Sequence, residues 1–402
     1  MKNDLNILTL APFYRWFIKG FVEAESKCIN KNNVIIHHNK LVEIANYIPY
    51  GNWFNHVRLY TKNKIADLEK LPENINVSLL ELIYLIPDGM NKRMGEKLIK
   101  KFEQFINTNN IEFDLIHSHF IWPQGYIGVQ LGKIFNCPVV ITLHENMTYL
   151  NSINKKIPKN VQWTLNNADA LIRVNNKDIP HFIQIGANPN RIYYIPNGYN
   201  QDFLKVINKN LAREKLGLEN DKKILINIAR LYKEKGQKFL IEAIEKVVKH
   251  NDNFVCYIGG IGPLKNQLNK QITQKNLNKY VKLLDYIPNE EIIYWMNAAD
   301  IFVLPSLDEG NPTVMFESLG IGLPFIGTNV GGIPEIITSE EYGLLVDPAN
   351  SNQLANKIIT ALNCNWNHEK IIQYGQQFTW QKIALSTIDI YKKIIYFKSN
   401  LS

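Results

Sequence analysis

The chain has 402 residues, which is too long for a single hydrophobic core and predicts two domains of ordinary size. A hydrophobic content of 46% and a charged content of 20% are normal for a soluble globular protein. The formal net charge is +8, and most of the basic excess lies in the first half of the chain. This excess predicts an anionic partner there, either membrane lipid headgroups or nucleic acid.

The four cysteines, Cys28, Cys137, Cys256 and Cys364, show no CxxC spacing, and each lies in or near an apolar or helical stretch. We expect reduced, buried thiols and a cytosolic compartment. No apolar run reaches the roughly 20 residues that a membrane-spanning helix needs. The segment Leu5–Leu10 is too short and too poorly flanked for a signal peptide, and it predicts a first strand.

Short apolar segments that predict buried strands alternate with helical patterns along the chain. In the first half we expect strands at Asn33–Ile36, Asp114–His117, Val139–His144 and Ala170–Val174, and helices at Gly89–Asn107 and Trp122–Phe135. In the second half we expect strands at Lys223–Ile228, Phe254–Ile258, Val281–Leu284, Ile301–Leu304 and Pro324–Gly327, and helices at Gln237–Lys249, Leu264–Asn276, Glu290–Ala298 and Thr313–Gly320. This alternation predicts an α/β protein with doubly wound parallel sheets that are covered on both faces.

A turn-forming segment at Ile195–Gln201 separates the two halves, because proline, asparagine and glycine follow one another there. We therefore expect an N-terminal domain over residues 1–198, a C-terminal domain over 199–378, and a terminal helix within 379–402. The helix follows from the amphipathic pattern of Trp380–Phe397. Two such domains would face a cleft at the carboxyl ends of their strands, where ligands of doubly wound sheets bind.

Two carboxylates eight residues apart, Glu309 and Glu317, follow the expected strand Ile301–Leu304. Glu309 falls on the loop, whereas Glu317 lies one to two turns into the expected helix Thr313–Gly320. The glycine and proline between them suit close ligand approach and a helix start whose free N–H groups favour an anion such as a diphosphate. The pair predicts a site for a phosphorylated, hydroxyl-rich ligand, but acids at a helix start also occur on ordinary surfaces.

Two cations, Arg230 and Lys235, follow the expected strand Lys223–Ile228. The fork of an arginine and the point charge of a lysine could bind a diphosphate and stabilise it as a leaving group. Glycine turns at Gly259–Leu264 and Val330–Glu335 follow two further strands and would let a nucleotide approach closely. The first turn lacks the G-x-G-x-x-G fingerprint, so solvated loop cations and plain turns remain the alternative interpretation.

Histidines end two strands of the first half. His119 and His144 should face the cleft, where each could bond a sugar hydroxyl or move a proton. Metal ligation by His117 with His119 is an alternative, although two positions of one strand make a poor metal site by themselves. A structural histidine is the other alternative for all three.

The first half also combines aromatic and basic residues. The aromatic segment is Phe13–Phe21, and the basic positions on the following helical pattern are Lys92, Arg93, Lys97, Lys100 and Lys101. A basic amphipathic helix beside exposed aromatic residues could lie on an anionic membrane, and a solvated helix face is the alternative. No nucleic-acid fold signature appears, so nucleic acid is not expected as a partner.

Together these segments resemble the retaining GT-B glycosyltransferases of family 4, which use nucleotide-sugar donors. The resemblance is strongest over Ile224–Pro348, and it rests on Arg230, Lys235, Gly259–Leu264, Ala299–Ser306, the Glu309-to-Glu317 spacing, Gly331–Glu335 and Gly343–Pro348. It is weaker over Asp114–His119, Thr142–His144 and Ile195–Gly198. It implies two Rossmann-like domains facing a cleft, with the acceptor mostly on the first domain and the donor on the second. The terminal helix is implied to cross back to the first domain.

The resemblance also implies residue roles. Glu317 would hold the donor ribose, Arg230 and Lys235 the diphosphate, and Glu309 with the backbone of Gly310–Thr313 the donor sugar. His119 would be the sugar-facing histidine at the reaction centre. The expected catalytic residues are His119, Glu309, Arg230 and Lys235; the donor-binding residues are Arg230, Lys235, Gly262, Ser306, Glu309, Gly310, Asn311, Pro312, Thr313 and Glu317; and the acceptor-side residues are Gly20, His144 and Asn197.

The sequence departs from the family pattern in three places. Ala11–Gly20 carries bulky aromatic residues where the family often has a Gly-Gly loop. Ile261 stands where an acid is common, and Asp285 stands where a glycine is common. The first departure concerns how the acceptor side approaches the phosphates, and the other two could alter the preference for base or sugar.

We expect transfer of a sugar from a nucleotide-diphosphate sugar to a saccharide or lipid-linked acceptor, with retained configuration, in polysaccharide or glycolipid biosynthesis. The acceptor hydroxyl would attack from the face that the diphosphate leaves, so no protein nucleophile, metal or other cofactor is expected. The alternatives are a GT-B phosphorylase, an epimerase, or a silent nucleotide-sugar-binding protein. The expected location is the cytoplasm, or the inner face of the cell membrane as a peripheral protein. The pattern does not predict the sugar, base, acceptor, linkage or oligomeric state.

Overall fold

The computed structural model describes residues 3–44, 60–83, 92–146 and 159–400. The chain divides into two compact units, and each is described by itself below. Unit 1 comprises Met1–Pro196 with Trp380–Ser402, and unit 2 comprises Asn197–Thr379. The last helix of the chain is therefore part of unit 1.

Unit 1 is built on a seven-stranded sheet in the order β3-β2-β1-β4-β5-β6-β7, in which neighbouring strands run parallel. The strands are β1 (Asn3–Ala11), β2 (Ile29–Asn39), β3 (Ile75–Leu82), β4 (Leu115–His119), β5 (Val139–Leu143), β6 (Ala170–Arg173) and β7 (Ile192–Tyr194). The predicted first strand is confirmed, whereas β3 and β7, the two edge strands, have no counterpart among the predictions.

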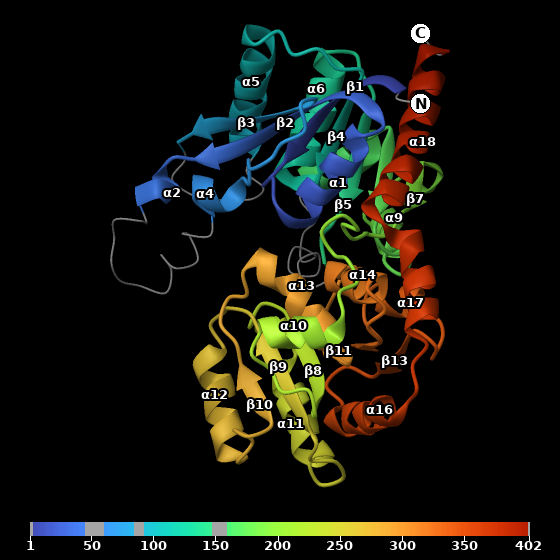
Figure 1. Ribbon diagram of the computed structural model, residues 1–402. Coiled ribbons are helices and arrows are strands. Elements are labelled where there is room, and N and C mark those ends of the chain that lie inside the picture. Colours follow the sequence, from blue (N-terminus) through green and yellow to red (C-terminus); the bar gives the residue numbers. More distant parts are fainter. Residues whose placement is uncertain (1–2, 45–59, 84–91, 147–158, 401–402) are drawn as a thin grey trace. The chain divides into compact units, whose positions relative to one another are not determined.

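Helices cover both faces of this sheet because successive strand residues point to opposite sides (Figure 1). The helices are α1 (Trp16–Ser26), α2 (Leu41–Ile44), α4 (Lys62–Ile65), α5 (Lys92–Thr108), the π-helical turn η2 (Ile121–Gly125), α6 (Tyr126–Ile134), α8 (Lys159–Asn167), α9 (Ile179–Gln184), the 3-10 turn η3 (Pro189–Arg191) and α18 (Trp380–Ser399). α1 and α18 share one core with Ile7, and α5, α6, α8 and α9 share the other with Leu8.

Two helix predictions in unit 1 need comment. The predicted start of the helix Gly89–Asn107 lies outside the described residues, and α5 is described from Lys92. The predicted helix Trp122–Phe135 is wrong at its start, because Trp122 has extended backbone angles (φ −131°, ψ 135°) and the regular helix α6 begins only at Tyr126.

Unit 2 has a six-stranded parallel sheet in the order β10-β9-β8-β11-β12-β13. Its strands are β8 (Lys223–Ile228), β9 (Phe254–Gly259), β10 (Val281–Leu283), β11 (Ile301–Leu304), β12 (Phe325–Thr328) and β13 (Gly343–Val346). The predicted bounds of β8 and β11 are confirmed residue for residue, those of β9 and β10 differ by one residue at one end, and those of β12 are shifted by one residue at both ends. No strand was predicted at β13.

The helical elements of unit 2 are α10 (Lys209–Lys215), η4 (Lys233–Lys235), α11 (Gln237–Val247), α12 (Lys265–Gln274), α13 (Asn289–Ala298), α14 (Thr313–Gly320), α15 (Ile333–Ile336), α16 (Ser351–Asn363), α17 (His368–Gly375) and η5 (Gln376–Phe378). α11, α12 and α16 cover one face of the sheet, and α13, α14, α15 and α17 cover the other. Two parallel sheets with helices on both faces confirm the predicted α/β class.

The strand orders locate the point in each sheet where ligands are expected. In both sheets the order reverses beside the first strand, between β1 and β4 in unit 1 and between β8 and β11 in unit 2. In doubly wound sheets the loops at the carboxyl ends of such neighbouring strands diverge and leave room for a ligand. The loops after β1, β4, β8 and β11 therefore carry the residues of greatest interest.

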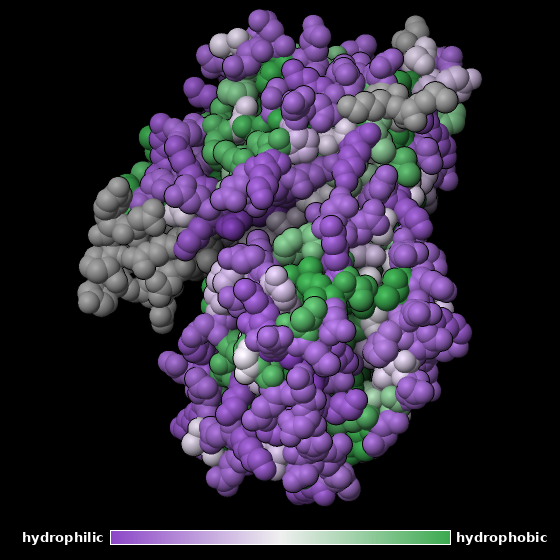
Figure 2. Space-filling model, in the orientation of Figure 1, coloured by the Kyte–Doolittle hydropathy of each residue, from purple (hydrophilic) through white to green (hydrophobic). Residues whose placement is uncertain are grey.

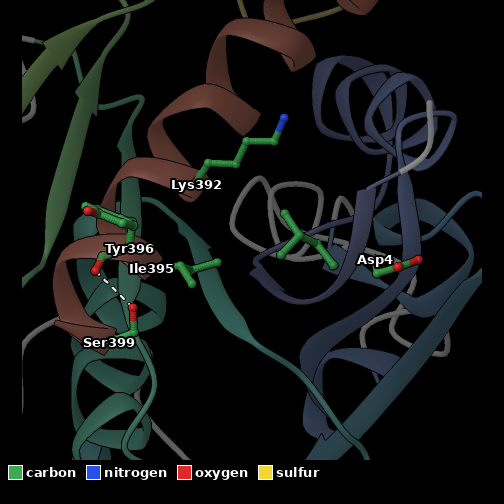
Figure 3. A pocket seen from close by; sticks show the side chains of 6 residues that line it. Asp4, Lys392, Ile395, Tyr396 and Ser399 are labelled. Carbon is green, nitrogen blue, oxygen red and sulfur yellow. Dashed lines mark hydrogen bonds between the residues drawn. The ribbon is translucent and has the colours of Figure 1, made fainter. Parts of the chain in front are cut away.

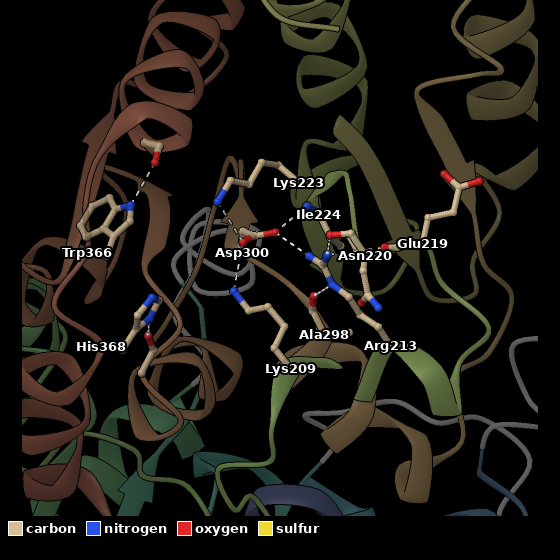
Figure 4. Close-up of polar contacts among 12 residues, drawn as sticks. Lys209, Arg213, Glu219, Asn220, Lys223, Ile224, Ala298, Asp300, Trp366 and His368 are labelled. Atoms are coloured by element: carbon tan, nitrogen blue, oxygen red, sulfur yellow. Dashed lines mark hydrogen bonds and ion pairs between the residues drawn. The ribbon is translucent and has the colours of Figure 1, made fainter. Parts of the chain in front are cut away.

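Asp300 organises the opposite, amino edge of the unit 2 sheet (Figure 4). Its carboxylate accepts hydrogen bonds from the Ile224 N–H (2.8 Å), Arg213 Nη2 (2.8 Å) and Lys209 Nζ (3.0 Å). Burial alone would raise the pKa of this carboxyl, but Lys209, the Ile224 N–H and Lys223 together lower it. Asp300 thus tethers β8 and α10 to β11, far from the carboxyl ends of the strands.

A surface pocket of unit 1 also lies at the amino edge of its sheet (Figure 3). Asp4 and Leu5 at the start of β1 line it, together with Lys392, Ile395, Tyr396 and Ser399 of α18. Hydrophilic side chains cover most of the described surface seen in Figure 2. Because ligands of doubly wound sheets bind at the carboxyl edge, this pocket is not a candidate for the main site.

The cysteines correct one expectation. Cys137 and Cys256 are buried and Cys28 is half-buried, but Cys364 is exposed. Cys364 follows α16 as its C-cap residue, so it lies outside the buried stripe of that helix. All four are free thiols.

Candidate functional site

An ion pair joins the two loops at the switch point of unit 2. Lys235, on the loop after β8, places its Nζ 2.7 Å from Oε1 of Glu309, on the loop after β11. Ser306 donates a hydrogen bond from Oγ to the same carboxylate oxygen at 2.7 Å. The Lys235 side chain is 18% exposed and that of Glu309 is 7% exposed. A ligand can therefore reach Lys235, whose side chain is held in place by the ion pair.

Close backbone packing holds these two loops together. Gly236 has a positive φ of 67°, and a Cβ there would lie 1.9 Å from the carbonyl oxygen of Pro305. Two residues away on each loop, the Leu307 N–H donates to the Glu234 carbonyl at 2.7 Å. Only glycine fits this crossing, which fixes the position of Lys235 relative to the loop after β11.

A second glycine loop, after β12, supports Glu309 from the other side. Gly331 has a φ of 52°, and a Cβ there would lie 1.9 Å from the Glu309 carbonyl oxygen. The Gly332 N–H donates to the Gly310 carbonyl at 2.8 Å. The segment from Glu309 to Gly310 is therefore clamped between the loops after β8 and β12.

Asn197 holds the next residue of this segment. Its backbone N–H donates to Asn311 Oδ1 at 3.0 Å, and its side-chain Nδ2 donates to the Asn311 carbonyl at 2.7 Å. Both residues are buried. The sequence placed Asn197 on the acceptor side, whereas the structure shows it as a support for the loop that leads into α14.

The glycine turn after β9 packs on the Arg230 loop. A Cβ at Gly262 would lie 2.4 Å from the Leu231 carbonyl oxygen, and the Leu231 N–H donates to the Ile261 carbonyl at 2.9 Å. Arg230 itself is 67% exposed, and its charge lies 3.7 Å from Glu234. Of the two predicted cations, Lys235 is held in place and Arg230 extends into solvent.

α14 begins directly after this clamped segment. Pro312 is its N-cap residue and offers no side-chain cap, so the first N–H groups, from Thr313 on, have no partner within the helix. Glu317 is the fifth residue of α14 and is half-buried. Its carboxylate makes no hydrogen bond or ion pair with any residue that the structure describes. Burial raises the pKa of Glu317 to about 7.

Seven of the ten predicted donor-binding residues thus lie on the loop after β11 or in the first turns of α14, and the other three lie on the loops after β8 and β9. All of these loops leave the same edge of one sheet. The arrangement offers a fixed cation, an adjacent carboxylate, uncapped N–H groups and a second carboxylate without a partner. Such a set suits an anionic, hydroxyl-rich ligand.

Unit 1 brings two of the predicted histidines together at its own switch point. His119 ends β4 and is 2% exposed, and its Nδ1 lies 3.0 Å from Nε2 of His144, which follows β5. Burial lowers the pKa of His119 to about 3. Burial, then the neighbouring His119 and Arg173, hold the pKa of His144 well below its usual range. Both rings are therefore neutral at pH 7, and one donates to the other.

His117 belongs to the core instead. Its Nε2 lies 2.7 Å from Thr142 Oγ1, and its Nδ1 lies 2.6 Å from the Tyr391 hydroxyl, so both nitrogens are satisfied. Within the described ranges no group of three His, Cys, Asp or Glu side chains could hold a metal ion. The alternative of a metal site at His117 and His119 has no geometric support among those residues.

Gly20 was expected on the acceptor side, in a loop after the first strand. The structure corrects this placement, because the loop ends at Arg15 and Gly20 lies inside α1. A Cβ at Gly20 would lie 2.7 Å from Nε1 of Trp380 in α18. Gly20 therefore allows α1 and α18 to approach each other.

The predicted basic helix is only partly available to a partner. Leu98, Phe102 and Ile106 of α5 are buried in the core, whereas the side chains of Lys97, Lys100 and Lys101 are exposed. The side chains of Lys92 and Arg93 lie outside what the structure describes. In the aromatic segment, Trp16 is 63% exposed.

Sequence reasoning missed Arg173 and Glu145, which surround the histidine pair. Arg173 is the last residue of β6 and is fully buried, and its guanidinium bonds the carbonyls of Leu143 and Glu145. The Glu145 carboxylate accepts the Ile121 N–H at 2.6 Å. The available signal was an arginine inside an otherwise apolar strand.

Comparisons with known proteins agree with this geometry. The family model "Glycosyl transferases group 1" matches residues 208–378, and the model "Glycosyltransferase Family 4" matches residues 66–203. An uncharacterized glycosyltransferase of Methanocaldococcus jannaschii is 28% identical over 365 residues, which cover 87% of this chain and 96% of that one. A D-inositol 3-phosphate glycosyltransferase of Corynebacterium efficiens is 26% identical over 314 residues, which cover 72% of this chain and 73% of that one.

Among solved structures, the Anabaena protein HepE in complex with UDP superposes with a TM-score of 0.73 at 19% identity, covering 97% of this chain and 100% of that one. The two parallel-sheet units therefore have the GT-B fold. The chain belongs to the group 1 glycosyltransferases and is an enzyme of that class. No helix within the described residues is both long and apolar enough to cross a membrane.

Proposed function

We propose that the chain transfers a sugar from a nucleoside-diphosphate sugar to a hydroxyl of a saccharide or lipid-linked acceptor, in polysaccharide or glycolipid biosynthesis. The observation that carries the proposal is the contact between Lys235 and Glu309 at 2.7 Å, on loops that leave the same sheet edge as α14. α14 carries Glu317, which has no hydrogen-bond or ion-pair partner among the described residues. Lys235 and the α14 N–H groups bind the diphosphate, Glu309 faces the donor sugar, and Glu317 takes the ribose hydroxyls. Arg230, which is exposed, folds onto the diphosphate when the donor binds.

The proposed reaction retains the configuration of the donor sugar. The departing diphosphate is stabilised by Lys235, Arg230 and the α14 N–H groups, and the acceptor hydroxyl attacks from the face that the diphosphate leaves. These cations do the work that a metal would otherwise do, so transfer should persist in the presence of a chelator. HepE was solved with UDP, and UDP sugars are therefore the first donors to test.

Glu317→Gln is expected to weaken donor binding by about 10- to 100-fold, because a hydrogen bond to a charged group contributes about 1.5–3 kcal/mol. Donor affinity of the unaltered protein should also rise as the pH increases through about 7, the pKa of Glu317, because the ionised carboxylate is the better acceptor. A thermal-shift panel of nucleoside diphosphates and nucleotide sugars measures both effects, since a ligand of the folded state raises the melting temperature.

Glu369→Gln is the matched control, because Glu369 is exposed in the first turn of α17. This variant should show the same rises in melting temperature with each nucleotide as the unaltered protein. Stabilisation by no nucleotide, or equal donor affinity in Glu317→Gln and the unaltered protein, would reject the assigned site. Donor binding without turnover on any acceptor would favour the silent nucleotide-sugar-binding alternative.

We also propose that unit 1 attracts anionic membrane lipids through the exposed lysines of α5. The apolar face of this helix is buried in the core, so the attraction is electrostatic and does not involve insertion of the helix. Replacing Lys97, Lys100 and Lys101 with glutamine is expected to weaken binding to phosphatidylserine-containing vesicles about fivefold for each lysine. Co-sedimentation at 50 and 300 mM salt measures the effect.

Exposed lysines of unit 2 provide the control, because they carry the same charge on another domain. Replacing Lys215, Lys249 and Lys270 with glutamine should leave vesicle binding nearly unchanged. Binding that does not depend on salt, or that both triple variants weaken equally, would contradict a specific role of α5.

A further inference from the structure

Arg173 is the largest fully buried side chain of the protein among the described residues. It ends β6, where it pairs in register with Leu143 of β5. Its Nη1 donates to the Leu143 carbonyl at 2.7 Å and to the Glu145 carbonyl at 2.8 Å. Its Nη2 forms an ion pair with Asp178. The guanidinium therefore has a partner of opposite charge and also binds the two carbonyls on either side of His144.

The backbone of His144 is thus fixed from both sides. Leu143 precedes it and Glu145 follows it, and one nitrogen of Arg173 bonds both of their carbonyls. The Glu145 side chain in turn accepts the Ile121 N–H at 2.6 Å, just after β4. This bond ties the segment that carries His144 to the segment that carries His119.

Because the backbone of His144 is fixed, its contact with His119 also restricts the His119 ring. Their facing nitrogens, His119 Nδ1 and His144 Nε2, lie 3.0 Å apart, and two neutral imidazoles share one proton there. The other ring nitrogen of His119, Nε2, is buried and has no hydrogen-bond partner within the described part of the chain. The tautomer chosen at the contact decides whether this Nε2 donates or accepts.

We propose that Arg173 is a positioning residue for glycosyl transfer: it fixes His144, and through the His144–His119 contact it sets the orientation and tautomer of His119. The proposal rests on the proposed function, and on the role at the reaction centre that the family resemblance implies for His119. Arg173 itself touches no substrate, because its side chain is fully buried.

The charges around His144 agree with this role. His119 of β4 and Arg173 of β6 both disfavour a proton on His144, and both act in addition to burial. Glu145 follows it in the chain, and burial raises the pKa of that carboxyl. Among the described residues, the rings of Phe17 and Phe120 also pack on His144, with centroids 4.8 and 5.0 Å from that of the imidazole, and they carry no charge.

Two variants test the proposal. Arg173→Lys keeps the charge but cannot bond Asp178 and both carbonyls with one planar fork. The double variant Arg173→Met with Asp178→Asn removes the ion pair without leaving an unpaired buried carboxylate. Both should lower kcat by about 10- to 100-fold, the cost of a small displacement of a catalytic group. KM for the donor should change little, since the donor residues lie in unit 2.

The double variant should also shift the acid limb of the pH–rate profile to higher pH, whereas Arg173→Lys should not, because the lysine retains the charge. A purely structural role would lower stability and leave that limb in place. Arg191→Met is the matched control, because Arg191 ends η3 and donates to the Ala168 carbonyl, just before the start of β6, at 3.3 Å. No other hydrogen bond of its side chain involves a described residue. This variant should behave like the unaltered protein.

Normal kcat in a folded Arg173→Lys variant would overturn the proposal, and this variant decides the matter if the double variant does not fold. An unchanged pH–rate profile in a folded double variant would overturn it as well. Nitrogen NMR of the histidine rings in the free protein tests the same idea without turnover. If the unaltered protein showed no transfer, the proposed function would fail, but altered His119 and His144 ring signals in Arg173→Lys would still support the positioning role.

Discussion

Replacing Lys235 with alanine is expected to lower kcat/KM for glycosyl transfer by about 100- to 1000-fold, the usual cost of removing one fixed group that stabilises a developing negative charge. Lys235 is the one predicted cation that the structure holds in place, by its ion pair with Glu309. Arg230 is 67% exposed and must lose conformational freedom when it binds the diphosphate. We therefore expect Lys235→Ala to cost more than Arg230→Ala.

The loss of Lys235 also changes the state of Glu309. This carboxylate is 7% exposed, and without Lys235 its only remaining contact among the described residues is Ser306 Oγ. An unpaired negative charge beside the diphosphate site would repel the donor. The double variant Lys235→Ala with Glu309→Gln should therefore bind the donor better than Lys235→Ala alone, even though neither variant transfers sugar efficiently.

Lys233→Ala is the control for both variants. Lys233 lies in the same 3-10 turn, η4, but its side chain is exposed. It should transfer at nearly the normal rate, and all variants should melt within a few degrees of the unaltered protein in the absence of donor. Near-normal kcat/KM in Lys235→Ala would remove the basis for the assigned donor site.

The sequence predicts the inner strands better than most edge strands: among the edge strands that the structure describes, β3, β7 and β13 were missed and β10 was predicted. β8 and β11 lie inside the sheet, and accordingly β11 is apolar throughout and β8 is apolar apart from Lys223 and Asn227. β3 and β7 are the edges of the unit 1 sheet and are mostly half-buried. β3 mixes polar and apolar residues, and β7 has only the three residues Ile192–Tyr194, so neither forms a long apolar run, and for this reason both escaped prediction.

The site was predictable as separate pieces but not as an arrangement. The sequence identifies a cation after one strand and a carboxylate after another, but the contact between Lys235 and Glu309 joins residues 74 positions apart. That contact follows from the strand order, in which β8 lies beside β11, and strand order is not encoded in local patterns.

Gly20 shows the converse case. Its pattern suggested a ligand loop, but its neighbour is Trp380 of a helix at the far end of the chain.

A buried carboxyl in unit 1 leads to the last prediction, which concerns stability. Glu25 of α1 is fully buried, accepts the Tyr391 O–H at 2.6 Å and accepts Asn32 Nδ2 at 2.7 Å. The Tyr391 oxygen also lies 2.6 Å from Nδ1 of His117. A single hydroxyl on α18 thus connects that helix to α1 and β4 in the core.

Burial raises the pKa of Glu25 to about 7, well above the value of about 4.3 for an unfolded chain. Between these two values the folded state keeps a proton that the unfolded state has lost. The contribution of Glu25 is therefore most favourable below about pH 4, falls as the pH rises to about 7, and changes little above it. The total change is at most about 4 kcal/mol, and Glu25→Gln should abolish it.

Tyr391→Phe is expected to destabilise unit 1 by about 1–3 kcal/mol, because it removes a hydrogen bond to Glu25 and leaves buried polar atoms without a partner. It should also raise the pKa of Glu25 further and steepen the decline in stability between pH 5 and 7.5. Tyr396→Phe is the control, because Tyr396 lies on the same helix but is 66% exposed. Calorimetry of the full chain at about pH 5 and about pH 7.5 measures the stability of all the variants. The stability of each variant is compared with that of the unaltered protein at the same pH, which cancels the similar contribution of Glu317 in unit 2. Equal melting temperatures for the two tyrosine variants would mean that the buried hydroxyl does not hold α18 to the sheet.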